Sequence, residues 1–155
     1  MAHKIVDLRS DTATRPTPEM RRRMAEAEVG DDVAGEDPTV NELERRAAEL
    51  LAKEAALFVA SGTMGNQIAI AVQSQPGDEV IVERTSHVYR WEAGGLAAIA
   101  HVQAAPLDGV RGVLTAAQVA GALRRLDDIH HPRTALVSLE STHNFGGGKV
   151  YPLSE

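Results

Sequence analysis

Apolar positions along the chain follow two patterns, one after the other. From Val40 to Leu51, apolar residues recur at intervals of three and four with charged residues between them, which predicts an amphipathic helix with a solvated outer face. The later apolar residues form short continuous runs, which are typical of strands covered on both faces. We expect four such strands, at residues 55–60, 80–82, 101–105 and 135–139.

Helix signals stand before and between these runs. Thr17-Pro18 and Asp37-Pro38 each place a capping residue before a proline, and Gly30 is a stop signal after Val29. Strand and helix then alternate, which requires parallel strands with right-handed crossovers. The sequence therefore predicts an α/β fold with a mostly parallel sheet. Later helices are expected at 64–73, 88–97 and 115–125, the last opened by the capping box Thr115-x-x-Gln118.

Composition narrows the possible partners and locations. The chain has the length of one domain at 155 residues, and its net charge of −6 comes with no basic stretch that would neutralise nucleic-acid phosphates. No apolar run is long enough for a membrane span or a leader, so we expect a cytoplasmic protein. The absence of cysteine excludes disulfides and thiolate chemistry. The chain ends soon after the fourth run, which predicts an incomplete sheet or a small complete domain.

The turn Ser61-Gly62-Thr63 is the most informative candidate site. It joins the first expected strand to a helix, at the sheet edge where ligands of parallel α/β folds bind. Free N–H groups and the positive end of a helix converge at such a turn and suit a phosphate group. The alternative is an ordinary tight turn with a helix cap.

Histidines supply the other candidate side chains. His87 follows the second expected strand, where an imidazole stacks on a flat ligand or caps a helix. His130 and His131 form a doublet before the fourth strand, but no third ligand has helpful spacing, so we expect no metal there. The acidic segment 31–37 lacks the alternating ligands of a calcium loop. Glycines 146–148 mark a loop whose main requirement is backbone freedom.

Several motifs extend over nearly the whole chain. They are residues 7–16 (DLRSDTATRP), 29–41 (VGDDVAGEDPTVN), 53–58 (KEAALF), 61–64 (SGTM), 87–95 (HVYRWEAGG) and 142–144 (THN). As an ordered set, they closely resemble the low-specificity L-threonine aldolases. The resemblance implies a three-layer, partial large domain of the aspartate-aminotransferase-like fold, with an N-terminal arm, helix and loop over residues 1–36 and an incomplete cofactor-binding domain over residues 37–155.

The resemblance also implies a function and its residues. The family uses pyridoxal 5'-phosphate to cleave β-hydroxy-α-amino acids, such as L-threonine, to glycine and an aldehyde. Ser61, Gly62 and Thr63 match its phosphate-binding turn, and His87 matches the imidazole that stacks on the cofactor ring. His130 matches a second active-site histidine near the substrate hydroxyl, and Ser10 a serine near the substrate carboxylate. Homo-oligomers, tetramers in this family, are expected for the full-length protein.

Two departures from the family matter. An aromatic residue usually stands where this chain has Ala34, at the substrate end of the site. None of Lys4, Lys53 and Lys149 lies in the Ser-Lys context of the lysine that binds the cofactor covalently, so the 155-residue chain alone is expected to be inactive. The alternatives are another β-eliminating lyase of the same fold and a non-catalytic remnant or interaction module.

Overall fold

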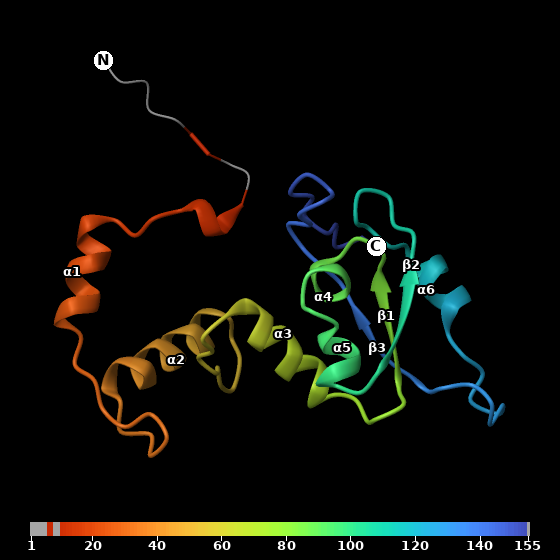
Figure 1. Ribbon diagram of the computed structural model, residues 1–155, viewed down its shortest axis with the longest axis horizontal. Coiled ribbons are helices and arrows are strands. Elements are labelled where there is room, and N and C mark those ends of the chain that lie inside the picture. The colour runs from red at the N-terminus through yellow and green to blue at the C-terminus, as the bar shows by residue number, and fades with distance from the viewer. Residues whose placement is uncertain (1–5, 8–9, 155) are drawn as a thin grey trace. The chain divides into compact units, whose positions relative to one another are not determined.

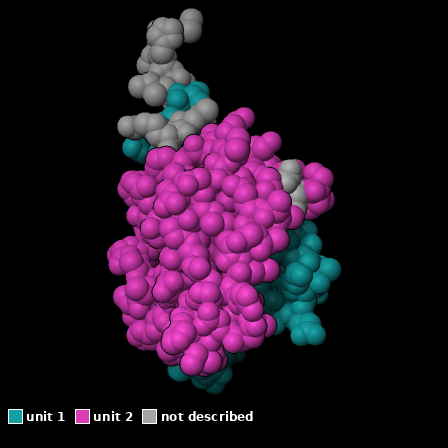
Figure 2. Space-filling model, turned by 90° about the vertical axis from the view of Figure 1, so that its right-hand side faces the viewer, with its two compact units in different colours: residues 1–58 teal, residues 59–155 magenta. Residues whose placement is uncertain are grey.

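The computed structural model describes residues 6–7 and 10–154 and is shown in Figure 1. The chain divides into two compact units, residues 1–58 and 59–155, which are coloured separately in Figure 2. The division of cofactor-binding and arm segments at residue 37 stays a prediction.

The first unit is helical. It contains the 3-10 helix η1 (Asp11–Ala13) and the helices α1 (Pro18–Glu26) and α2 (Pro38–Leu50). Both α-helices begin at the expected prolines. The Asp37 carboxylate accepts the N–H groups of Thr39 and Val40 at 2.9 Å and so caps α2. Helix α1 ends earlier than expected.

The second unit contains a parallel sheet. Its three strands have the order β2-β1-β3, and β1 pairs in parallel with both neighbours. In this register Ile81 of β1 lies opposite Ala105 of β2 and Val137 of β3. The elements are α3 (Gly62–Ala71), β1 (Glu79–Glu83), α4 (His87–Arg90), α5 (Gly95–Ala98), β2 (Gln103–Leu107), α6 (Ala116–Ala122) and β3 (Thr134–Ser138).

Strand β1 is the centre of the core. Val80 and Val82 are fully buried and pack with Ile70 of α3 and Leu96 of α5. Ile81 points to the opposite face, since side chains alternate along a strand. In Figure 1, helices α4 and α5 lie to the left of the strands and α6 lies to their right. This three-layer α/β arrangement agrees with the predicted fold class.

The prediction of a strand at 55–60 was wrong. Residues 55–59 form no regular element. The N–H of Phe58 donates to the Glu44 carboxylate at 2.6 Å instead of to a neighbouring strand. Leu57 and Phe58 are 65% and 53% exposed, so the apolar run exists without a covering layer. Three of the four expected strands are present.

The helix predicted at 88–97 is divided into α4 and α5. Ala93 and Gly94 have φ values of 52° and 74°, in the left-handed region that interrupts a right-handed helix. The break turns Glu92 inward, where it is 4% exposed. The capping box at Thr115 and Gln118 is confirmed at the start of α6.

Candidate functional site

A small cleft lies at the carboxyl end of β3. It has a volume of about 230 Å³ and is lined by residues of α3, α4, the end of β3 and the segment after it, including Asn66, His87, Ser138 and Glu140. This is the sheet edge at which parallel α/β folds bind ligands.

Glu92 orients the ring of His87 in this region. Its side chain is completely buried, and its Oε1 lies 2.8 Å from His87 Nδ1 and 2.7 Å from the amide nitrogen of Asn66. The Gln67 amide donates to the other carboxylate oxygen. A carboxylate only accepts, so His87 carries its proton on Nδ1. Among the described residues, Nε2 of this half-exposed ring has no hydrogen-bond partner.

The N-terminus of α3 has free donors. Ser61 is the N-cap, and its hydroxyl accepts the N–H of Met64 at 3.1 Å. The N–H groups of Gly62 and Thr63 have no partner among the residues that the structure describes, as expected for the first turn of a helix. A Cβ at Gly62 would meet nothing within 4 Å. The turn therefore presents open, unpaired donors next to a helix dipole.

The same helix links this turn to His87. Asn66 stands one turn after Gly62 in α3 and touches Glu92, which in turn holds the His87 ring. The structure therefore brings the Ser61-Gly62-Thr63 helix and His87 together through one buried carboxylate. Sequence reasoning missed Glu92 and Asn66, although Glu92 stands at i+5 from His87 within a recognised motif.

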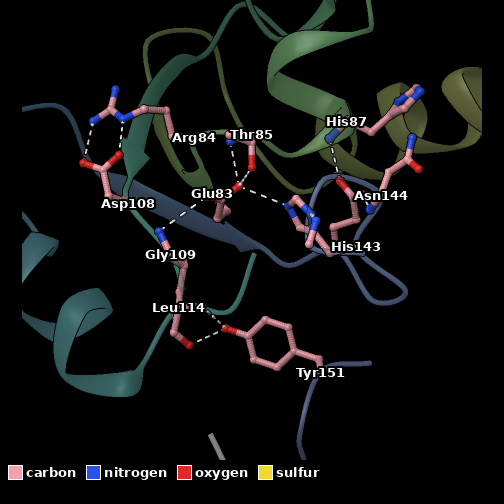
Figure 3. A network of polar contacts seen from close by, with 12 residues as sticks. Glu83, Arg84, Thr85, His87, Asp108, Gly109, Leu114, His143, Asn144 and Tyr151 are labelled. Atoms are coloured by element: carbon pink, nitrogen blue, oxygen red, sulfur yellow. Dashed lines mark hydrogen bonds and ion pairs between the residues drawn. The ribbon is translucent and has the colours of Figure 1, made fainter. Parts of the chain in front are cut away.

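A second acidic residue, Glu140, follows β3. One carboxylate oxygen accepts the backbone N–H of His87 at 2.5 Å, and the other accepts the N–H of Asn144 at 2.9 Å. The His87 ring points away from this contact, as Figure 3 shows. Glu140 therefore holds the start of α4 without using the imidazole.

Glu83, at the end of β1, and His143 form a buried pair. Glu83 accepts the N–H and hydroxyl of Thr85 and faces His143 Nε2 at 3.1 Å. Burial opposes its ionisation, but the hydrogen bonds from Thr85, Gly109 and His143 outweigh burial and lower the pKa of Glu83. Sequence analysis noted residues 142–144 only as a motif and missed this pair.

Ser10 and His130 are the other predicted site residues. Ser10 belongs to the first unit, where its hydroxyl caps η1 by accepting the N–H of Thr12 at 3.3 Å. His130 is exposed and precedes the amino end of β3, whereas His87 follows the carboxyl end of β1. The two imidazoles therefore lie at opposite edges of one parallel sheet. Their substrate roles stay predictions.

No three potential metal ligands among His, Cys, Asp and Glu come together in the described part of the chain. Within that same part, no helix is both long and apolar enough to cross a membrane.

Comparisons with known proteins cover nearly the whole chain. The family model described as beta-eliminating lyase matches residues 7–155. A low specificity L-threonine aldolase of Escherichia coli is 48% identical over 149 residues, which are 96% of this chain and 44% of the relative. A probable low-specificity L-threonine aldolase 2 of Arabidopsis thaliana is 44% identical, over 97% of this chain and 43% of the relative.

A solved structure agrees with the fold. A threonine aldolase of Leishmania major superposes with a TM-score of 0.64 at 28% identity, over 81% of this chain and 36% of that chain. An uncharacterized protein of Caenorhabditis elegans is 51% identical, over 97% of this chain and 37% of its own length. The chain thus spans less than half the length of the curated relatives that it matches.

Proposed function

The chain belongs to the beta-eliminating lyase family, and from this premise we propose that it forms the cofactor-phosphate and ring-stacking part of an aldolase. The substrates we propose are L-threonine, L-allo-threonine and related β-hydroxy-α-amino acids, which are cleaved to glycine and an aldehyde. The relatives named as L-threonine aldolases support this choice. The observation that carries it is the link from the α3 turn through Glu92 to His87.

The residues present fit pyridoxal 5'-phosphate. The unpaired N–H groups of Gly62 and Thr63 and the hydroxyls of Ser61 and Thr63 would hold the phosphate at the start of α3. His87 would stack on the pyridine ring. When bound, this cofactor supplies an electron sink for breaking the Cα–Cβ bond.

The remaining steps belong to protein side chains. Glu92 keeps the proton of His87 on Nδ1 and leaves Nε2 free, so that Nε2 is able to take or return the substrate hydroxyl proton. We propose Ser10 for the substrate carboxylate and His130 for the substrate hydroxyl, on the family motifs alone. Within one chain, His130 lies at the amino ends of the strands and His87 at their carboxyl ends. The role of His130 therefore needs its own variant.

Location and assembly are further proposals. We propose a cytoplasmic protein, supported by a chain without cysteine, which needs no oxidising compartment. We propose homo-oligomers for the full-length protein, with small amino acids and no nucleic acid as partners. The net charge of −6 supports the exclusion of nucleic acid.

A hybrid protein tests the function. Residues 1–155 are joined to the remaining part of the Escherichia coli aldolase, and glycine and acetaldehyde are measured from L-threonine with added pyridoxal phosphate. We expect turnover by the hybrid and none by the 155-residue chain, whose three lysines lack the family's Ser-Lys context. Pyruvate and ammonia from L-serine, without aldehyde from L-threonine, would establish the β-eliminating alternative.

Histidine variants test the residue assignments. His87→Ala is expected to weaken cofactor binding by the 155-residue chain and to reduce turnover by the hybrid. His130→Ala is expected to leave cofactor binding by the chain unchanged and to reduce turnover by the hybrid. His101→Asn, at an exposed position with φ of 55°, is the control. A folded chain that binds no cofactor would favour a non-catalytic module.

A further inference from the structure

One buried histidine holds the segment after β3 together through hydrogen bonds. We call Glu140–Lys149 the glycine loop, and His143 within it is 1% exposed. The N–H of His143 donates to the carbonyl of Lys149 at 2.9 Å, and its Nδ1 accepts the N–H of Gly146 at 3.0 Å. Since Nδ1 accepts, the proton lies on Nε2, which donates to the Glu83 carboxylate. Both ring nitrogens are therefore used, in one tautomer.

Two glycines allow the close packing around His143: Gly112 against its ring and Gly146 against the backbone of Arg111. A Cβ at Gly112 would lie 2.2 Å from the His143 ring, and a Cβ at Gly146 would lie 2.2 Å from the carbonyl oxygen of Arg111. Gly112 also has φ of 82°. The guanidinium of Arg111 donates to the Gly146 carbonyl at 3.1 Å. The loop is thus fixed to the segment after β2 as well as to the end of β1.

The glycine loop contacts both ends of helix α4. At the start, Glu140 accepts the N–H of His87 and also the N–H of Asn144. At the end of α4, Phe145 stacks on Trp91, the C-cap residue of the helix. The ring centroids are 5.6 Å apart, and the angle between the ring planes is 6°. Helix α4 has only four residues, too few to be stable by itself, so these contacts determine where it lies.

We propose that His143 is a positioning residue for His87. It anchors the glycine loop to Glu83 at the end of β1, and the loop in turn holds α4 through Glu140 and Phe145. Figure 3 shows His143 between Glu83 and Asn144, on the side of the loop away from the His87 ring. The consequence for catalysis rests on the proposed function, whereas the anchoring of α4 does not.

Two variants of His143 separate its two contacts. The side-chain N–H of His143→Gln replaces the Nε2 donor to Glu83. The side-chain oxygen of His143→Asn replaces the Nδ1 acceptor for Gly146 but cannot reach Glu83. His101→Asn is the control for an exposed histidine. All variants are studied as the 155-residue chain without cofactor, under conditions where circular dichroism shows the wild-type fold.

Two spectroscopic signals report on α4. The backbone N–H of His87, observed by ¹⁵N-edited NMR, lies downfield while it donates to a carboxylate. Trp91 is the single tryptophan, and its acrylamide quenching reports its stacking on Phe145. Because Trp91 is already 56% exposed, full release raises the quenching constant by less than about twofold.

We expect His143→Asn to move the His87 N–H upfield and to raise Trp91 quenching, and His143→Gln to stay near wild type. A histidine that merely stabilises the core would lower the melting temperature of both variants without moving either native-state signal. That result would overturn the proposal, as would a response of His143→Gln alone.

A second variant covers the case in which neither His143 variant folds. Glu140→Gln leaves the buried pair of Glu83 and His143 intact and weakens the acceptor for the N–H groups of His87 and Asn144. The His87 signal should therefore move upfield while Trp91 quenching stays unchanged. An unmoved His87 signal would reject the proposal. Failure of the wild-type chain to bind pyridoxal phosphate would reject the proposed function and leave this result standing.

Discussion

His87 and Glu92 show how one buried side chain determines the orientation of another. Glu92 accepts hydrogen bonds from Asn66, Gln67 and His87, and its complete burial is tolerated because each carboxylate oxygen has a partner. A shorter or neutral residue at this position would leave amide donors of α3 unpaired. The residue therefore connects helix α3 to the His87 ring through one buried carboxylate.

The first prediction concerns this carboxylate. Glu92→Gln replaces an acceptor oxygen with a donor that faces the amides of α3, so the His87 ring loses its fixed orientation. We expect the affinity for pyridoxal phosphate to fall about tenfold, which corresponds to one charged hydrogen bond of roughly 1.4 kcal/mol. The measurement is quenching of Trp91 by the cofactor, with exposed Glu54→Gln as control. Equal affinities would contradict the assigned role.

The second prediction concerns Glu83 and pH. Burial raises its pKa, but hydrogen bonds from Thr85, Gly109 and His143 outweigh this, so the folded-state pKa lies below the unfolded value near 4.5. Its stabilising contribution is present above pH 4.5 and is lost as the pH falls through the folded-state pKa. Urea unfolding at several pH values should therefore show a flatter acid dependence for Glu83→Gln than for wild type. The same pH dependence of the unfolding free energy in both proteins would contradict a stabilising role of the Glu83 carboxylate.

At the scale of elements, short helices depend on their surroundings. α4 and α5 have four residues each, and they are held by hydrogen bonds and packing from α3, β1 and the glycine loop. α3 and α2 have local caps, Ser61 and Asp37, and longer apolar faces. The site therefore combines α3, which is stabilised by its own sequence, with α4, whose position depends on contacts with neighbouring elements.

The third prediction tests the turn beneath the glycine loop. Gly112→Ala places a Cβ against the His143 ring and imposes a side chain on a φ of 82°, so we expect destabilisation of about 1–3 kcal/mol. Gly121→Ala is the matched control, because Gly121 lies in α6 with open space around it. That change should be neutral or stabilise by up to about 1 kcal/mol. Equal effects in thermal unfolding would contradict this account.

At the scale of the whole chain, a three-stranded sheet with two open edges leaves apolar residues without a cover. Val137 and Leu139 are 39% and 51% exposed at the β3 edge, and the apolar run at 55–60 has no strand neighbour. Exposed strand edges and apolar surface of this kind favour association.

The fourth prediction follows from this exposure. The purified 155-residue chain should associate in a concentration-dependent way, as measured by sedimentation velocity over a range of concentrations. Val137→Thr with Leu139→Thr should reduce the association, because both residues lie on or next to the exposed edge strand. A monodisperse wild-type monomer with a cooperative melt would instead support a small complete domain.

Local sequence determined much of the fold. Pro18, Pro38, Ser61 and Thr115 start helices where the capping pattern predicts them, because an N-cap and the first turn interact within a few residues. Three apolar runs became parallel strands. The turn at Ser61 is recognisable for the same local reason, and the ordered motifs by themselves indicate the family.

Tertiary structure decided the rest. The run at 55–60 has the composition of a strand, but a strand also needs a partner strand, and the Phe58 N–H donates to the Glu44 side chain instead. The pairing of Glu92 with α3, of Glu83 with His143 and of Glu140 with the His87 N–H joins residues 25 to 60 positions apart. Such contacts depend on which strand ends meet at one sheet edge, and no local pattern specifies the partners.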